Sequence, residues 1–178
     1  MNSLFFNYAT ALLELCKEQN EELVEVRTSI KFLVELFRKN RDFAALLNAP
    51  NVSNEEKCSV IDNVFNEFQP ILINFLKLLI NKGRAFYIYD ILKECLIRFN
   101  TYLNYDSGII YSSKPLTIEN IEKIKNALEE KMNKRIELIN EIDPSLIGGF
   151  KIKLNNSTYD ASIKNKLDNM RKVLTEGN

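Results

Sequence analysis

Histidine is missing from this chain of 178 residues, and its formal charges sum to zero. Histidine is the usual general base near neutral pH and the commonest metal ligand, so its absence removes the commonest route to acid–base and metal chemistry. The 24 basic residues are balanced by 24 acidic ones, which leaves no overall field toward nucleic acid or an anionic membrane. We therefore expect no catalytic residues, no metal, no cofactor and no nucleic-acid partner.

Cysteine is scarce as well. Cys16, Cys58 and Cys95 are odd in number and far apart, and neither a CxxC pair nor a histidine accompanies them. Zinc sites and cysteine nucleophiles need such companions. All three fall on apolar helical stripes, which favours small buried thiols in a chain from a reducing compartment.

The sequence also lacks a long hydrophobic run. Its longest apolar stretch, residues 70–80, is interrupted by Asn74 and Lys77 and is much shorter than the roughly 20 residues that span a bilayer. The N-terminal residues have neither the basic start nor the apolar core of a secretory signal. We expect membrane association only through partner proteins.

Amphipathic helices dominate the sequence up to about residue 105. Apolar residues recur there at helical spacing in six segments. The segments cover residues 4–16, 23–37, 43–47, 54–68, 70–82 and 85–105. Residues 1–105 are therefore predicted to form a six-helix bundle.

Several of these helices have clear end signals. Ser53 and Glu56 have the spacing of a capping box at the start of the fourth helix. Pro70 suits the first turn of the fifth helix, and Gly83 suits a left-handed residue just past its end. The fifth helix is apolar almost all round, so it is either fully enclosed or shares its exposed side with a partner.

The pattern changes after a turn-rich link at residues 104–108. Short strands are predicted to alternate with one helix, as in a small α/β domain spanning residues 106–178. The strands cover residues 109–112, 136–142 and 146–154, and the helix covers residues 118–131. The whole chain is assigned to the α+β class.

Paired glycines interrupt the last predicted strand. Gly148 and Gly149 lie among strand-forming neighbours and indicate a bulge or a close approach of another backbone. Asp160 and Ser162 follow as predicted caps of a closing helix at residues 163–174.

Three stretches were weighed as chemical sites. Asp143 and Asp160 are more simply a turn residue and a helix cap than an acid–base pair. The glycine pair lacks the spacing of phosphate-binding loops. Lysines between residues 123 and 135 alternate with glutamates, which favours a solvated helix face over a nucleic-acid patch.

Four stretches form a series along the chain. They are Tyr8-Ala9-Thr10-Ala11-Leu12, residues 75–84, residues 112–117, and residues 143–154 with Asp160-Ala161-Ser162. Together they resemble the delta subunit of bacterial F-type ATP synthase, a relative of the mitochondrial oligomycin-sensitivity-conferring protein. The chain has Ala161 where that family often has glycine, and Asn7 where it commonly has a basic residue.

The resemblance implies two partners. In that family the first and fifth helices form a groove for the amphipathic N-terminal helix of an alpha subunit, while the C-terminal domain holds the C-terminal helices of the b subunits. Carried over by motif, the groove residues are Tyr8, Ala9, Leu12, Phe75, Leu78 and Leu79. Gly83, Gly148, Gly149, Asp160 and Ser162 carry structural roles.

The expected function is that of a non-catalytic stator subunit of a proton-translocating F-type ATP synthase. Such a subunit links the catalytic head to the peripheral stalk, at the cytoplasmic face of a bacterial inner membrane. The alternative is a cytosolic helical regulatory module that binds other proteins, and an enzyme ranks third.

Overall fold

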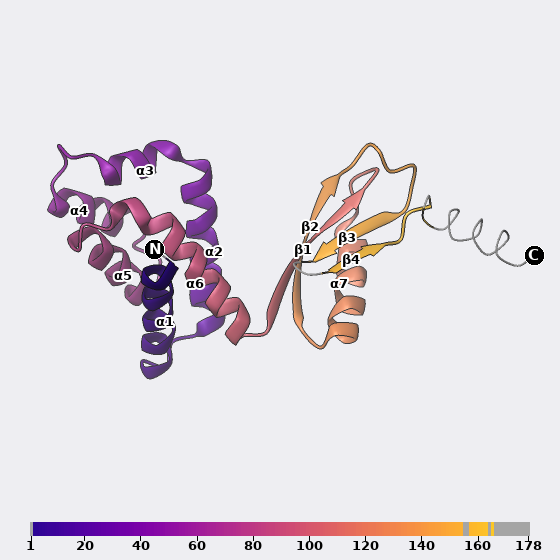
Figure 1. Ribbon diagram of the computed structural model, residues 1–178, viewed down its shortest axis with the longest axis horizontal. Coiled ribbons are helices and arrows are strands. Elements are labelled where there is room, and N and C mark those ends of the chain that lie inside the picture. The colour runs from indigo at the N-terminus through magenta and orange to yellow at the C-terminus, as the bar shows by residue number, and fades with distance from the viewer. Residues whose placement is uncertain (1, 155–156, 164, 166–178) are drawn as a thin grey trace, which may run out of the picture. The chain divides into compact units, whose positions relative to one another are not determined.

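The computed structural model describes residues 2–154, 157–163 and 165 (Figure 1). The α+β class is confirmed: the described residues contain seven α-helices and one four-stranded sheet. The chain divides into two compact units, Met1–Leu103 and Asn104–Asn178. Each unit has its own hydrophobic core.

The first unit is helical throughout. Its α-helices α1–α6 are joined by short loops, and a 3-10 turn, η1, precedes the last of them. The bounds are α1 Asn2–Glu18, α2 Leu23–Lys39, α3 Arg41–Asn48, α4 Asn54–Val64, α5 Pro70–Asn81, η1 Ala85–Tyr87 and α6 Ile88–Tyr102. Helix α6 packs against both α1 and α2, so it forms the centre of this unit.

The predicted start of α4 and the predicted end of α5 are confirmed, whereas α4 and α6 end at Val64 and Tyr102, before the predicted residues 68 and 105. Ser53 Oγ accepts from the Glu56 amide while the Glu56 carboxylate accepts from the Ser53 amide, which completes the capping box of α4. At the end of α5, Gly83 has a φ of +67°. The Gly83 and Arg84 amides donate to the carbonyls of Ile80 and Leu79, which is the Schellman arrangement.

One charged side chain lies deep in the helical unit. Arg27 of α2 is only 1% exposed, and its Nε donates to Asn100 Oδ1 of α6 at 2.6 Å. Burying a guanidinium is costly unless its donors are paired. This bond therefore ties α2 to α6 within the core.

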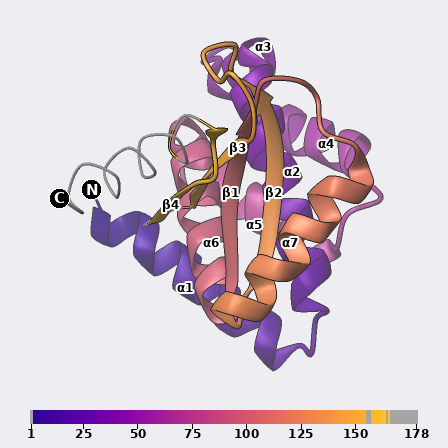
Figure 2. The same cartoon turned by 90° about the vertical axis from the view of Figure 1, so that its right-hand side faces the viewer.

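The second unit is a mixed sheet covered on one face by α7 (Figure 2). Its elements are β1 Tyr105–Ser112, α7 Ile118–Met132, β2 Arg135–Ile142, β3 Phe150–Leu154 and β4 Ser157–Asp160. The strand order is β2-β1-β3-β4; β1 and β2 are parallel, while β3 and β4 run antiparallel to their neighbours. Leu128 of α7 packs with Ile110, Ile136, Ile152 and Leu154.

The start of this unit differs from the prediction. The sequence predicted a turn-rich link at residues 104–108, but β1 already begins at Tyr105. Gly108 lies inside β1. A side chain does not fit at this position, because a Cβ there would overlap the Leu154 side chain and lie 2.9 Å from the Lys153 carbonyl oxygen. The glycine thus serves close strand pairing rather than a turn.

The glycine pair is partly as predicted. Gly148 and Gly149 were predicted to lie inside a strand. They instead lie just before β3, which begins at Phe150. The predicted close approach of backbones is confirmed at Gly149, where φ is +80° and a Cβ would lie 2.5 Å from the Ala161 carbonyl oxygen. At Gly148 the neighbour is a side chain, since a Cβ there would lie 2.7 Å from Ile163 Cδ1.

The segment after β3 contains a strand that the sequence did not predict. β4 is short and mostly polar, so it shows no apolar alternation. Ser162 Oγ then accepts from the Asn165 amide, as a helix cap does, and Asp160 accepts from the Ser162 amide. The rest of the predicted closing helix lies outside the described residues.

Candidate partner-binding groove between α1 and α5

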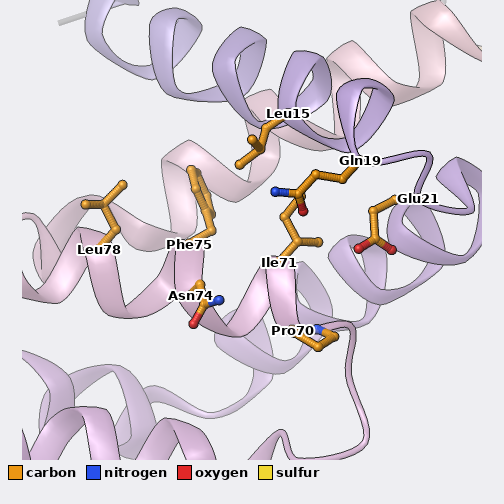
Figure 3. A pocket seen from close by; sticks show the side chains of 8 residues that line it. All are labelled: Leu15, Gln19, Glu21, Pro70, Ile71, Asn74, Phe75 and Leu78. Atoms are coloured by element: carbon orange, nitrogen blue, oxygen red, sulfur yellow. The ribbon is translucent and has the colours of Figure 1, made fainter.

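A cavity of about 330 Å³ lies between α1 and α5 (Figure 3). One wall comes from the end of α1 and the loop that follows it, and the other comes from α5. The lining residues are Leu15, Gln19, Glu21, Pro70, Ile71, Asn74, Phe75 and Leu78.

The apolar part of the groove has a buried floor and exposed edges. Ile71 and Phe75 are almost fully buried, while Leu15 is 41% and Leu78 is 44% exposed. Helix α5 is apolar nearly all round, so Ile71 and Phe75 belong to the core and also line the groove, while Leu78 remains exposed at its edge. Helix α5 is therefore not fully enclosed within this chain, since Leu78 stays exposed.

An aromatic contact continues the groove beyond Phe75. The Tyr8 ring of α1 meets Phe75 edge to face, with ring centroids 6.2 Å apart. Arg84, just past the end of α5, places Cζ 5.6 Å from the Tyr8 ring centroid. Arg84 Nε is buried and has no hydrogen-bond partner among the described residues.

The six predicted groove residues separate into two sets. Phe75 and Leu78 line the cavity, and Tyr8 contacts Phe75. Ala9, Leu12 and Leu79 are at most 1% exposed and pack inside the core. They do not belong to the cavity lining.

Sequence reasoning missed six of the eight residues that line the groove. They are Leu15, Gln19, Glu21, Pro70, Ile71 and Asn74. Helical spacing offered a signal for part of this set, because positions seven and eleven residues after Tyr8 fall on the same side of a helix. Those positions are Leu15 and Gln19.

Comparisons with known proteins agree with the fold and with the motifs. A family model described as "ATP synthase delta (OSCP) subunit" matches residues 6–174. The chain is 35% identical to "ATP synthase subunit delta" of Mycoplasma mobile, over 95% of this chain and 94% of that protein. It is 30% identical to the protein of the same name in Clostridioides difficile, over 99% and 98%.

The chain belongs to the ATP synthase delta (OSCP) subunit family. A solved structure shows the same fold: a chain of the Toxoplasma gondii mitochondrial ATP synthase hexamer aligns with a TM-score of 0.65 at 20% identity, covering 97% of both chains.

Membership of this family settles the broad function. The protein is a structural, non-catalytic stator subunit of an F-type ATP synthase, which is a membrane-associated complex. This replaces the alternative of an unrelated regulatory module. No helix among the described residues is both long and apolar enough to cross a bilayer.

Two of the three thiols predicted to be buried are buried, Cys16 and Cys95, whereas Cys58 is only partly buried. Burial raises the pKa of Cys16 to about 11 and raises the pKa of Cys95 further. A nucleophilic cysteine needs the opposite shift, toward the thiolate. Both thiols are packing groups of the core shared by α1 and α6.

The two aspartates that were weighed as an acid–base pair also have structural roles. Hydrogen bonds from Ser145 lower the pKa of Asp143, and hydrogen bonds from Ser162 lower the pKa of Asp160. A general acid at neutral pH needs a raised pKa. The carboxylates instead fix a turn and the start of the segment after β4.

Proposed function

We propose that the groove between α1 and α5 holds the amphipathic N-terminal helix of an ATP synthase alpha subunit. The observation that carries this proposal is the apolar cavity whose edges, Leu15 and Leu78, remain about two-fifths exposed although its floor is buried. An amphipathic helix inserts apolar side chains at one-turn spacing into such a groove. Leu15, Ile71, Phe75 and Leu78 would line its apolar stripe.

The gain in binding energy is modest at each residue. Covering the exposed parts of Leu15 and Leu78 is worth about 1 kcal/mol each, since fully burying a leucine side chain gains roughly 1.5–3 kcal/mol. A contact of this size suits a protein held at several places, because tethering within one assembly raises the effective concentration at every contact.

We place the stalk contact on the second unit. One face of its sheet is covered by α7, and the other carries a shallow cavity of about 320 Å³ beside Ile109 and Ile139. Ile139 is 59% exposed. We propose that the second unit, residues 104–178, binds the C-terminal helices of the b subunits while the helical unit of residues 1–103 binds the head.

This arrangement explains the stator role in mechanical terms. One unit holds the head and the other holds the peripheral stalk, so the head is kept from turning with the rotor. The protein would act at the cytoplasmic face of a bacterial inner membrane, and it would be attached there through its partners alone.

Replacing Leu78 by aspartate tests the groove. A synthetic peptide of the alpha-subunit N-terminal segment, titrated into the full-length protein, should bind at least about tenfold more weakly to Leu78→Asp, because a carboxylate then replaces an apolar contact. Calorimetric titration measures the affinity.

Ile97→Asp is the matched control. Ile97 is an exposed aliphatic residue of α6 that does not line the cavity, so this variant should bind the peptide like the unmodified protein. Equal affinities for the two folded variants would show that the peptide does not bind in the groove.

A further inference from the structure

Opposite charges lie toward the two ends of the groove: Glu21 is part of its lining, whereas Arg84 lies outside the lining, over the ring of Tyr8. Glu21 lies at the Pro70 end, and Figure 3 shows it at the far side of the cavity from Leu78. At the other end, Phe75 contacts Tyr8, and Tyr8 in turn lies beneath Arg84. Between these ends the lining is apolar apart from Gln19 and Asn74, so charge marks only the ends.

Arg84 has unused binding capacity in this structure. Its backbone amide completes the end of α5 by donating to the Leu79 carbonyl, which fixes the start of the side chain beside the last turn of α5. Its Nε is buried without a hydrogen-bond partner among the described residues. A buried donor left unpaired is costly, and a carboxylate is the strongest acceptor for a guanidinium.

The groove itself does not supply that carboxylate. The acidic residue in its lining is Glu21, at the opposite end. The aromatic ring of Tyr8 partly compensates the guanidinium charge, but a ring face does not replace a hydrogen-bond acceptor. An occupant cannot reach the buried Nε, but Arg84 as a whole is only half-buried, so a carboxylate of the occupant would bind the part of the guanidinium that remains accessible.

We propose that Arg84 and Glu21 orient the docked helix by its charges. A carboxylate of the helix binds Arg84, and a lysine or arginine of the same helix binds Glu21. The inference rests on the proposed function, since it takes the occupant to be the alpha-subunit N-terminal helix, and adds which charged residues that helix must present and at which end.

The length of α5 sets their separation. Twelve residues span about 18 Å at 1.5 Å per residue. The two charges of the occupant therefore lie about three turns apart, on the same side of the helix as its apolar stripe. A helix docked in reverse would bring its carboxylate to Glu21 and its cation to Arg84, and like charges in contact disfavour that orientation.

Removing the charge of Arg84 tests the proposal. The alpha-subunit peptide should bind Arg84→Gln about tenfold more weakly than the unmodified protein at low salt. The loss should shrink at high salt, because salt screens the attraction that the variant lacks. Arg84→Lys should keep most of the salt dependence, since it keeps the charge.

Lys82→Gln is the matched control. Lys82 is exposed, lies two residues from Arg84, and is not part of the cavity lining. The Lys82→Gln variant loses one positive charge, as Arg84→Gln does. Its affinity for the peptide should stay within about twofold of that of the unmodified protein. Equal losses in Arg84→Gln and Lys82→Gln would reduce the effect to net charge and overturn the proposal.

Substitutions in the peptide identify the partner group. Each acidic residue of the peptide is replaced in turn by its amide, and the affinity is measured with the unmodified protein and with Arg84→Gln. One carboxylate should lose its effect when Arg84 is already gone, which is the signature of a direct pair in a double-mutant cycle. Additive losses at every acidic position would overturn the pairing.

The two proposals fail in different ways. If the unmodified protein does not bind the peptide, the proposed occupant is wrong and the charge pairing falls with it. If the peptide binds and Leu78→Asp weakens it, but Arg84→Gln behaves like Lys82→Gln, only the charge pairing is wrong. Thermal unfolding of every variant separates a lost contact from a lost fold.

Discussion

At the scale of single residues, the glycines show two different reasons for lacking a side chain. Gly83 ends α5 with a positive φ, and an added Cβ there would meet no atom within 4 Å. Gly149 combines a positive φ with a Cβ position 2.5 Å from the Ala161 carbonyl oxygen. Conformation is therefore the constraint at Gly83, whereas conformation and space both constrain Gly149.

Alanine at these two positions should separate the two effects. Gly83→Ala should lower the free energy of unfolding by about 1 kcal/mol, the usual cost of a left-handed alanine. Gly149→Ala should lose roughly 2–4 kcal/mol, because the backbone around Ala161 must also move. Urea denaturation of the full-length protein measures both. Equal losses would mean that the approach to Ala161 relaxes without cost.

At the scale of elements, α2 and α6 are joined by a buried polar bond as well as by apolar packing. Asn100→Ala should lower the free energy of unfolding of the helical unit by about 1–3 kcal/mol, because it removes an acceptor of the buried Arg27 guanidinium. Chemical denaturation followed by helical circular dichroism measures the loss.

The neighbouring residue supplies a control for this measurement. Thr101 is exposed on α6, and its hydroxyl donates only to the carbonyl of Ile97 one turn earlier. Thr101→Ala should leave the stability nearly unchanged. An Asn100→Ala loss no larger than that of Thr101→Ala would show that the core tolerates Arg27 without this acceptor.

Elements whose signals are local were predictable from the sequence. The capping box at Ser53, the proline at the start of α5 and the glycine after it each act within a few residues, so the start of the fourth helix and both ends of the fifth were predicted. The fourth helix was predicted to reach residue 68 but ends at Val64. β4 was missed because it pairs with β3 through its backbone while its side chains are mostly polar.

Contacts between distant residues were beyond such reasoning. The Asn140 side chain accepts from the Leu116 amide and donates to the Ile110 carbonyl and the Ser112 hydroxyl. It thereby holds the loop after β1, although nothing in its own sequence neighbourhood indicates this. Likewise, Tyr8 and Phe75 were both predicted for the groove, but only the fold shows that Glu21 and Arg84 lie toward its two ends.

At the scale of the whole molecule, the two units have separate cores, and this separation supports a division of labour. A protein that links two parts of a complex needs each binding surface to stay formed while the other is loaded. Independent cores provide this, because each unit keeps its own apolar packing.

A fragment of residues 1–103 should therefore fold by itself and bind the alpha-subunit peptide with nearly the affinity of the full-length protein. The core of α1–α6 is formed by these residues alone. A fragment of residues 104–178 should bind a peptide from the C-terminal helix of the b subunits, but it should unfold more readily, since a shorter chain buries a smaller share of its surface. Calorimetric titration of each fragment against each peptide measures all four pairings.

Two results would contradict this division. If the helical fragment binds the b peptide and not the alpha peptide, the two roles are exchanged. If neither fragment binds a peptide that the full-length protein binds, the two binding surfaces are not independent of each other.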